Sequence, residues 1–135
     1  MAVRGRIRVM ATTARILMLG EGRSQVGDAA AALAAHGYEV RIAPADEAGA
    51  AHVATFWPDL VLIFFAGCAR AELLAQVRSR SGVPLVVWAG GCDREDVVRA
   101  LRQGADDYVG GQVAVEELEA RVVAHLRRAR WSAPV

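Results

Sequence analysis

The sequence predicts an α/β fold, a single domain built on a doubly wound parallel sheet with helices on both faces. Three observations support this. Five apolar runs of strand length alternate with five stretches of helical spacing along the 135 residues. The strongest runs are continuously apolar rather than alternating, which is typical of strands that are covered on both faces. The links between segments are short, so no second domain is expected.

The strands are expected at 15–20, 38–43, 59–65, 84–89 and 106–110. The first, third and fourth contain the strongest apolar runs, RILMLG, DLVLIFF and PLVVWA. The second and fifth, YEVRIA and DDYVG, are weaker but lie at the right spacing to complete a five-stranded sheet.

Helices are expected between and after the strands, at 23–36, 46–56, 70–80, 93–104 and 115–130. Asp93 occupies the position of an N-cap, and Gly104 lies where the chain leaves the fourth helix. The last helix begins with acidic residues and ends in arginines, which is favourable for the helix dipole. Residues 1–13 are expected to form an arm, 14–130 the domain, and 131–135 a tail or the start of a linker.

Composition excludes several classes of protein. Apolar residues make up 54% of the chain and the net charge is +1, so no bulk attraction to nucleic acid or membranes is expected. The longest apolar run, at 60–69, is about half the length of a membrane span. The N-terminal leader lacks the apolar core of a secretion signal, so a cytoplasmic location is expected. The three histidines show no metal-ligand spacing, and no metal or cofactor is expected.

The two cysteines, Cys68 and Cys92, fall in expected loops at the carboxyl edge of the sheet. They follow neighbouring strands and could approach one another, so a redox switch is one interpretation. Ordinary free thiols are the other, and the one the sequence favours.

A glycine-rich turn, LMLGEGRSQVGD at 17–28, raises the question of nucleotide binding. Gln25 stands where a dinucleotide fingerprint requires its third glycine, and no acidic residue closes the second strand. The chain contains no lysine, so a Walker-type loop is excluded as well. The turn is therefore interpreted as a plain connection from strand to helix.

Three segments carry a family resemblance: HGYEVRIA at 36–43, PDLVLIF at 58–64, and GADDYV at 104–109 followed by VEELEARVVAHLRR. They resemble the receiver domain of two-component response regulators, and the OmpR/PhoB type most closely. The resemblance implies a flavodoxin-like (CheY-like) fold with strand order 2-1-3-4-5. It also implies a regulatory module with a fused or partner DNA-binding domain, while direct nucleic-acid binding by this domain is not expected.

The resemblance also implies a phosphorylation site, and this sequence departs from it. In such receivers an aspartate ends the third strand, two acids ending the first hold Mg²⁺, and a hydroxyl and a lysine contact the phosphoryl oxygens. The corresponding positions here are Gly20, Glu21, Phe64, Ala89 and Gly111. Glu21 alone keeps the required chemistry. The sequence therefore predicts a pseudo-receiver with no phosphoryl transfer and no enzymatic activity.

Two interpretations of the altered corner remain open. Glu21, Phe64, Phe65, Trp88 and Gly90 could line an apolar pocket with one carboxylate, which would suit a small-molecule sensor. Alternatively, the aromatic side chains collapse into the space and fix one conformation. Burial of such a ring is worth about 2–3 kcal/mol, which favours collapse.

The resemblance further implies a dimer face formed by the fourth helix, fifth strand and fifth helix. Arg99, Asp107, Tyr108, Glu117 and Arg121 match the family pattern there. Pairs of Arg99 with Glu117 and of Asp107 with Arg121 are expected across a two-fold axis, and Tyr108 is expected to be a fixed packing residue. The same charges could instead form a solvated face, or dock a different protein.

Overall fold

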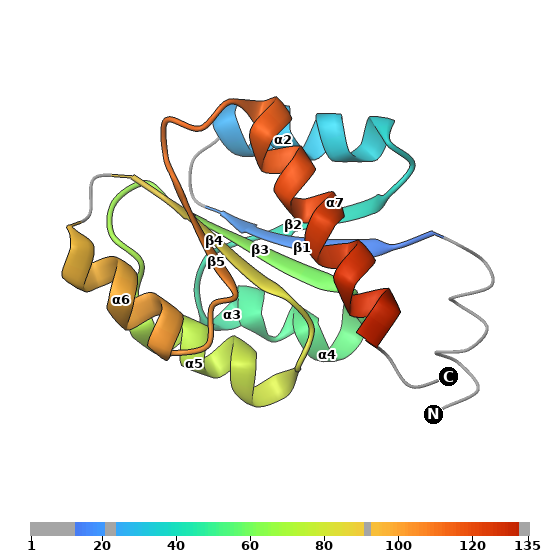
Figure 1. Ribbon diagram of the computed structural model, residues 1–135. Helices are drawn as coiled ribbons and strands as arrows, with labels where there is room; N and C mark the ends of the chain where they lie inside the picture. The colour runs from blue at the N-terminus through green and yellow to red at the C-terminus, as the bar shows by residue number, and fades with distance from the viewer. Residues whose placement is uncertain (1–12, 21–23, 91–92, 133–135) are drawn as a thin grey trace.

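The computed structural model describes residues 13–20, 24–90 and 93–132, with side chains up to residue 129. Its centre is one five-stranded sheet in which all neighbouring strands run parallel, in the order β2-β1-β3-β4-β5 (Figure 1). The strands are β1 (Arg15–Gly20), β2 (Glu39–Ala43), β3 (Leu60–Phe65), β4 (Leu85–Ala89) and β5 (Asp107–Gly110). The fold class and the strand order predicted from the sequence are confirmed.

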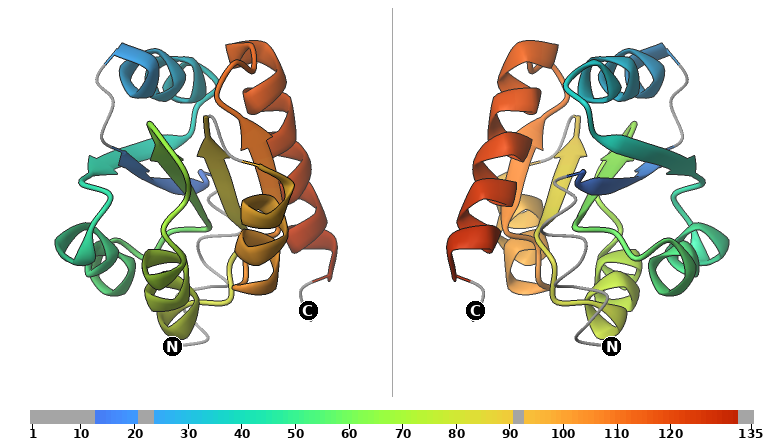
Figure 2. Two further views of the ribbon diagram at one scale, coloured as in Figure 1. Left: turned by 90° about the vertical axis from the view of Figure 1, so that its left-hand side faces the viewer. Right: turned by 90° about the vertical axis from the view of Figure 1, so that its right-hand side faces the viewer.

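Helices cover both faces of the sheet (Figure 2). On one face lie α2 (Ser24–Ala35) and α7 (Val115–Ser132). On the other lie α3 (Glu47–Ala50), α4 (His52–Phe56), α5 (Ala71–Arg80) and α6 (Arg94–Arg102). Within the described part of the chain, no helix combines the length and the apolar character needed to cross a bilayer.

Each strand contributes side chains alternately to the two layers. In β1, Leu17 and Leu19 pack toward α3–α6, whereas Ile16 and Met18 pack toward α2 and α7. Because both sides are covered, every residue of β3 and β4 is buried. This is the physical reason for the continuous apolar runs in the sequence.

The ends of α6 follow the expected capping. The Asp93 side chain accepts a hydrogen bond from the backbone N–H of Asp96 at 3.0 Å, which fixes the first turn. Gly104 has a φ of +121°, a conformation that favours glycine, where the chain turns back into β5.

Most element boundaries differ from the sequence-based expectation by one or two residues, and one expected helix is divided in two. The helix expected at 46–56 is divided at Ala51 into α3 and α4, and Ala54 N–H donates to the carbonyl of Ala51, a three-residue spacing. This segment contains Gly49 and Thr55, which are weak helix formers. The last helix runs to Ser132, past the expected end at 130.

Candidate functional site

The carboxyl ends of the strands converge at the edge where open α/β sheets bind ligands. Gly20 of β1 pairs with Phe64 of β3 in the sheet register, and Ala89 of β4 pairs with Gly110 of β5, which precedes Gly111. The four positions Gly20, Phe64, Ala89 and Gly111 are called the corner below. Glu21, the remaining expected acid, lies outside the described residues.

Phe64 fills the middle of the corner with an aromatic ring. The residue is 3% exposed, and its ring meets that of Trp88 edge-on, with centroids 4.6 Å apart and planes at 61°. This is a favourable arrangement for an aromatic pair. Both side chains belong to the core cluster beneath α2 and α7. The position that the family resemblance assigns to the phosphoryl acceptor therefore belongs to the hydrophobic core.

Gly20 leaves no room for the acid that the family pattern places there. A Cβ atom at this position would lie 2.7 Å from Cγ2 of Val26, a residue of α2 that is itself in the core. Any larger side chain requires α2 or Val26 to move. Glycine at position 20 thus permits the observed contact between β1 and Val26 of α2.

The other side of the corner is closed by backbone. A Cβ atom on Gly111 would lie 2.9 Å from the Cα of Gly90 and 3.2 Å from its nitrogen, so the segments after β4 and β5 approach closely. The Gln25 side chain of α2 donates a hydrogen bond to the carbonyl of Gly111 at 3.5 Å. Glycine at position 111 permits this close approach to the backbone of Gly90, which a lysine side chain would disturb.

The pocket expected from the sequence is not assembled from all its residues. Phe65 follows Phe64 in β3 and packs on the opposite face, toward α3–α6, where the Arg70 guanidinium lies 5.3 Å from its ring centroid. Phe64 and Trp88 face α2 and α7 instead. Among the described residues, no group of three His, Cys, Asp or Glu side chains is arranged to hold a metal ion.

Cys68, in the segment between β3 and α5, is disulfide-bonded. The expectation of a free thiol at this position is therefore wrong. Because β3 and β4 are neighbours, the segments that follow them leave the sheet at the same edge. Cys92 lies outside the described residues.

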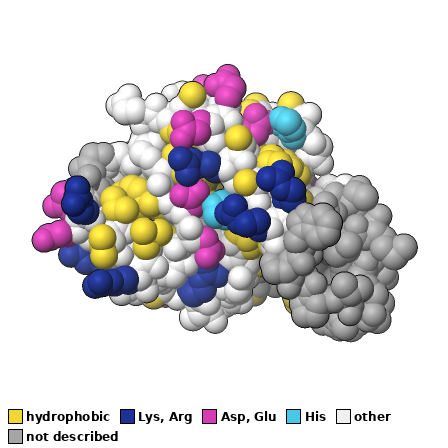
Figure 3. Space-filling model, in the orientation of Figure 1, with side chains coloured by type: hydrophobic (Ala, Val, Ile, Leu, Met, Phe, Trp, Pro, Cys, Tyr) yellow, Lys and Arg dark blue, Asp and Glu magenta, His cyan; other side chains and the backbone are white. Residues whose placement is uncertain are grey.

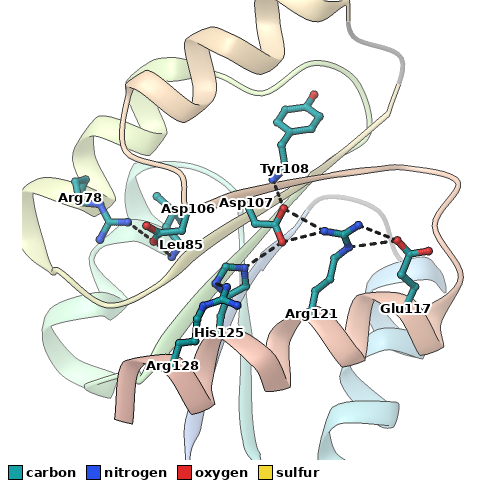
Figure 4. Close-up of polar contacts among 9 residues, drawn as sticks. All are labelled: Arg78, Leu85, Asp106, Asp107, Tyr108, Glu117, Arg121, His125 and Arg128. Atoms are coloured by element: carbon teal, nitrogen blue, oxygen red, sulfur yellow. Dashed lines mark hydrogen bonds and ion pairs between the residues drawn. The ribbon is translucent and has the colours of Figure 1, made fainter. Parts of the chain in front are cut away.

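The charged residues that the sequence analysis assigned to a dimer face lie on α6, β5 and α7, and Figure 4 shows the contacts among those of β5 and α7. Arg121 donates to Glu117 at 3.0 Å, one helical turn away, and to Asp107 of β5 at 3.3 Å. Arg99 pairs within α6 with Asp96 at 2.8 Å. The chain thus forms the Asp107–Arg121 pair by itself, and Arg99 and Glu117 each have an intramolecular partner.

Asp107 is the centre of this face. Burial on its own would raise the pKa of the carboxyl, but the hydrogen bond from His125 and the charge and hydrogen bond of Arg121 outweigh it. The pKa is consequently held below its ordinary value. Asp107 remains charged at neutral pH, and its contribution to stability is lost only as the pH falls through this lowered value.

Tyr108 packs against the α3–α6 core layer, and its hydroxyl is buried with no hydrogen-bond partner among the described residues. Burial and the nearby charge of Asp96 raise the pKa of Tyr108. Beside it, α6 exposes Val98 and Leu101 at 37% and 43%. Figure 3 shows hydrophobic side chains gathered on this side of the molecule with charged groups around them.

The sequence did not single out a second polar cluster, at the opposite edge of the sheet. Arg78 of α5 donates to the carbonyls of Val83 and Gly104, at 2.7 and 2.6 Å, and to the carboxylate of Asp106 at 2.9 Å. Next to it, His125 of α7 contacts Asp107. The spacing of 117, 121, 125 and 128 places these four side chains on one stripe of α7, but the sequence does not indicate which residues of other elements this stripe meets.

No family model matches the chain. DNA-binding response regulator MtrA from Mycolicibacterium smegmatis is 44% identical over 73 residues, which are 53% of this chain and 32% of that protein. The phosphate regulon transcriptional regulatory protein PhoB from Klebsiella pneumoniae is 35% identical over 77 residues, 53% of this chain and 34% of that protein. The matched regions span about a third of the length of these relatives.

Solved receiver domains share the fold. A CheY-like receiver domain protein from Methanospirillum hungatei matches with a TM-score of 0.80 and 26% identity, over 90% of this chain and 99% of that one. The BeF3-activated receiver domain of Klebsiella pneumoniae RstA matches with a TM-score of 0.74 and 27% identity, over 84% and 98%. Relatives and fold agree: this chain is a homologue of OmpR/PhoB-type response regulators, and its fold is that of their receiver domain.

Proposed function

We propose that this receiver domain acts without phosphorylation, as a dimerisation module of a cytoplasmic transcription regulator. The relatives named above carry DNA-binding or transcriptional roles in their names. We therefore propose that the module works with a DNA-binding domain, fused to it or supplied by a partner. The proposed role of the receiver domain itself is to mediate dimerisation of the regulator.

The observation that carries the proposal is the burial of Phe64 against Trp88 at the end of β3. A phenyl ring has no atom that accepts a phosphoryl group, and here it also occupies the space of the acceptor. The tight contacts around Gly20 and Gly111 support a packed corner rather than an open ligand site. Collapse of the corner is the interpretation these contacts favour over ligand sensing.

Incubation with acetyl phosphate and Mg²⁺ is expected to leave the intact mass of the protein unchanged. Transfer requires a carboxylate nucleophile and a bound divalent cation, and the corner offers neither among its described residues. Mass spectrometry checks this, with a receiver domain that keeps the aspartate and the acid pair as the positive control. A gain of one phosphoryl group at the corner would contradict the proposal.

The dimer is proposed to form through the charged face and the apolar side chains beside it. Val98 and Leu101 are exposed on α6, the helix that also carries the Arg99–Asp96 pair. An apolar patch surrounded by charges of both signs is typical of a protein interface. In a two-fold dimer each charged side chain would form ion pairs with the partner as well as within its own chain.

Sedimentation equilibrium of Arg121→Glu tests the face. The reversed charge faces Asp107 and Glu117 of its own chain and of the partner, so the dimer dissociation constant is expected to rise at least about tenfold, which corresponds to about 1.4 kcal/mol. Arg127→Glu makes the same charge change at an exposed position of α7 and is the matched control. Identical sedimentation of the wild type and Arg121→Glu would place any dimer interface elsewhere.

A further inference from the structure

His125 is a buried histidine that joins two oppositely charged groups. Its side chain is 10% exposed. Its Nε2 lies 3.0 Å from Oδ2 of Asp107, and its Nδ1 lies 2.9 Å from Nη2 of Arg128 (Figure 4). A guanidinium only donates hydrogen bonds, so Nδ1 must be the acceptor and Nε2 must carry the proton donated to Asp107. These contacts select the neutral imidazole in one tautomer.

Charged groups face this imidazole from each element around it. From β5 comes Asp107, and from the residue just before it comes Asp106, which pairs with Arg78 of α5. From α7 come Arg128 and, through Asp107, Arg121. A hollow of about 400 Å³ lies alongside, lined by Gly82, Pro84, Asp106, His125, Arg128 and Ala129. It offers space into which the end of a displaced arginine side chain can move.

A proton taken from solvent at Nδ1 changes both contacts. The lone pair that accepts from Arg128 is lost, and two cations then face each other at hydrogen-bond distance. At Nε2 the imidazolium places a full positive charge next to the Asp107 carboxylate, which already accepts hydrogen bonds from Arg121. Histidine side chains ordinarily undergo this change of charge between about pH 5 and 8.

We propose that His125 is a proton-dependent lock on the charged face. In its neutral form it bridges Asp107 and Arg128. In its protonated form it releases Arg128 toward the hollow and competes with Arg121 for Asp107. Asp107 then attracts an arginine of a partner copy less strongly, so acid weakens the dimer. This last step rests on the proposed dimerisation, whereas the lock itself does not.

Nitrogen-15 NMR of the imidazole ring between pH 5 and 8 tests the lock directly. At the upper end the neutral ring is expected to carry its proton on Nε2. The Arg128 Nε–H signal is expected to shift with the same midpoint as His125. In His125→Gln, which keeps a donor toward Asp107 but cannot titrate, this shift should be lost. A neutral ring protonated on Nδ1, or an Arg128 signal that does not follow His125, would overturn the lock.

The dimer dissociation constant at pH 7.5 and 5.5 tests the consequence. For the wild type it is expected to rise at least about fivefold in acid, and for His125→Gln to change less than about twofold. An equal rise in both proteins would overturn the coupling of the lock to the dimer. Protein that is monomeric at both pH values, with the NMR signature intact, would refute the dimerisation proposal and leave the lock established.

Discussion

Replacement of Phe64 by alanine is expected to lower the free energy of unfolding by about 3–5 kcal/mol. The ring is buried under α2 and α7, and its loss leaves a cavity beside Trp88 that the rigid ends of the strands fill poorly. Urea denaturation followed by fluorescence measures the effect, because one of the chain's three tryptophans is the direct neighbour of the ring.

Phe64→Leu is the matched control, since it keeps an apolar side chain and most of the volume. We expect it to cost less than about half of the alanine value. Phe64→Asp, which restores the family's acceptor residue, should be at least as destabilising as alanine because it buries a carboxylate without a partner. A Phe64→Asp protein of wild-type stability would contradict the packed corner.

Replacement of Arg78 by alanine is expected to lower the free energy of unfolding by about 2–4 kcal/mol. Its side chain is only 26% exposed, and its guanidinium donates hydrogen bonds to the carbonyls of Ser81, Val83 and Gly104 and to the carboxylate of Asp106. Hydrogen bonds made by a charged donor contribute about 1.5–3 kcal/mol each and do not add fully. Thermal and urea unfolding measure the loss.

Arg80→Ala is the control for Arg78. It removes an arginine from the same helical turn whose one described contact is a 3.4 Å hydrogen bond to Gln76, within its own helix. Substitutions of this kind at the surface usually change the free energy of unfolding by no more than about 0.5 kcal/mol. Arg78→Lys should recover part of the stability, because an ammonium keeps the charge but cannot reach all the acceptors at once. Equal stability of Arg78→Ala and Arg80→Ala would mean that solvent replaces these contacts.

Both predictions concern positions that hold segments of the chain together. Phe64 fixes the carboxyl edge of the sheet, and Arg78 fixes the opposite edge by joining α5 to the segments before β4 and β5. Between them, β5 carries Asp107, from which the charged face is organised.

The sequence by itself determined the sheet and, through the family resemblance, the strand order, and the structure confirms both. The loss of the phosphorylation chemistry is a prediction from the residues at the strand ends. A strand that is buried on both faces must be apolar at every position, so such strands can be recognised from the local sequence alone. The place of the corner in the fold could also be predicted, because each of its positions lies at or next to the end of an apolar run.

The expectation that Phe65 shares a pocket with Phe64 was wrong, and the alternation of side chains along a strand already excludes it. Adjacent residues of a strand point to opposite faces, so Phe64 and Phe65 could not line one pocket. Cys68 is different: its bonding depends on how close separate segments approach after folding.

The tertiary structure alone decided the contacts of Arg78 and His125. Arg78 binds mainly backbone carbonyls. Because every residue carries a carbonyl, the residue types in the sequence do not indicate which ones Arg78 contacts. His125 reaches Asp107 because of the rotation of α7 about its axis where it crosses β5, and that angle is set by packing of the whole layer. Patterns of period two and 3.6 are local, whereas these contacts depend on where separate elements meet.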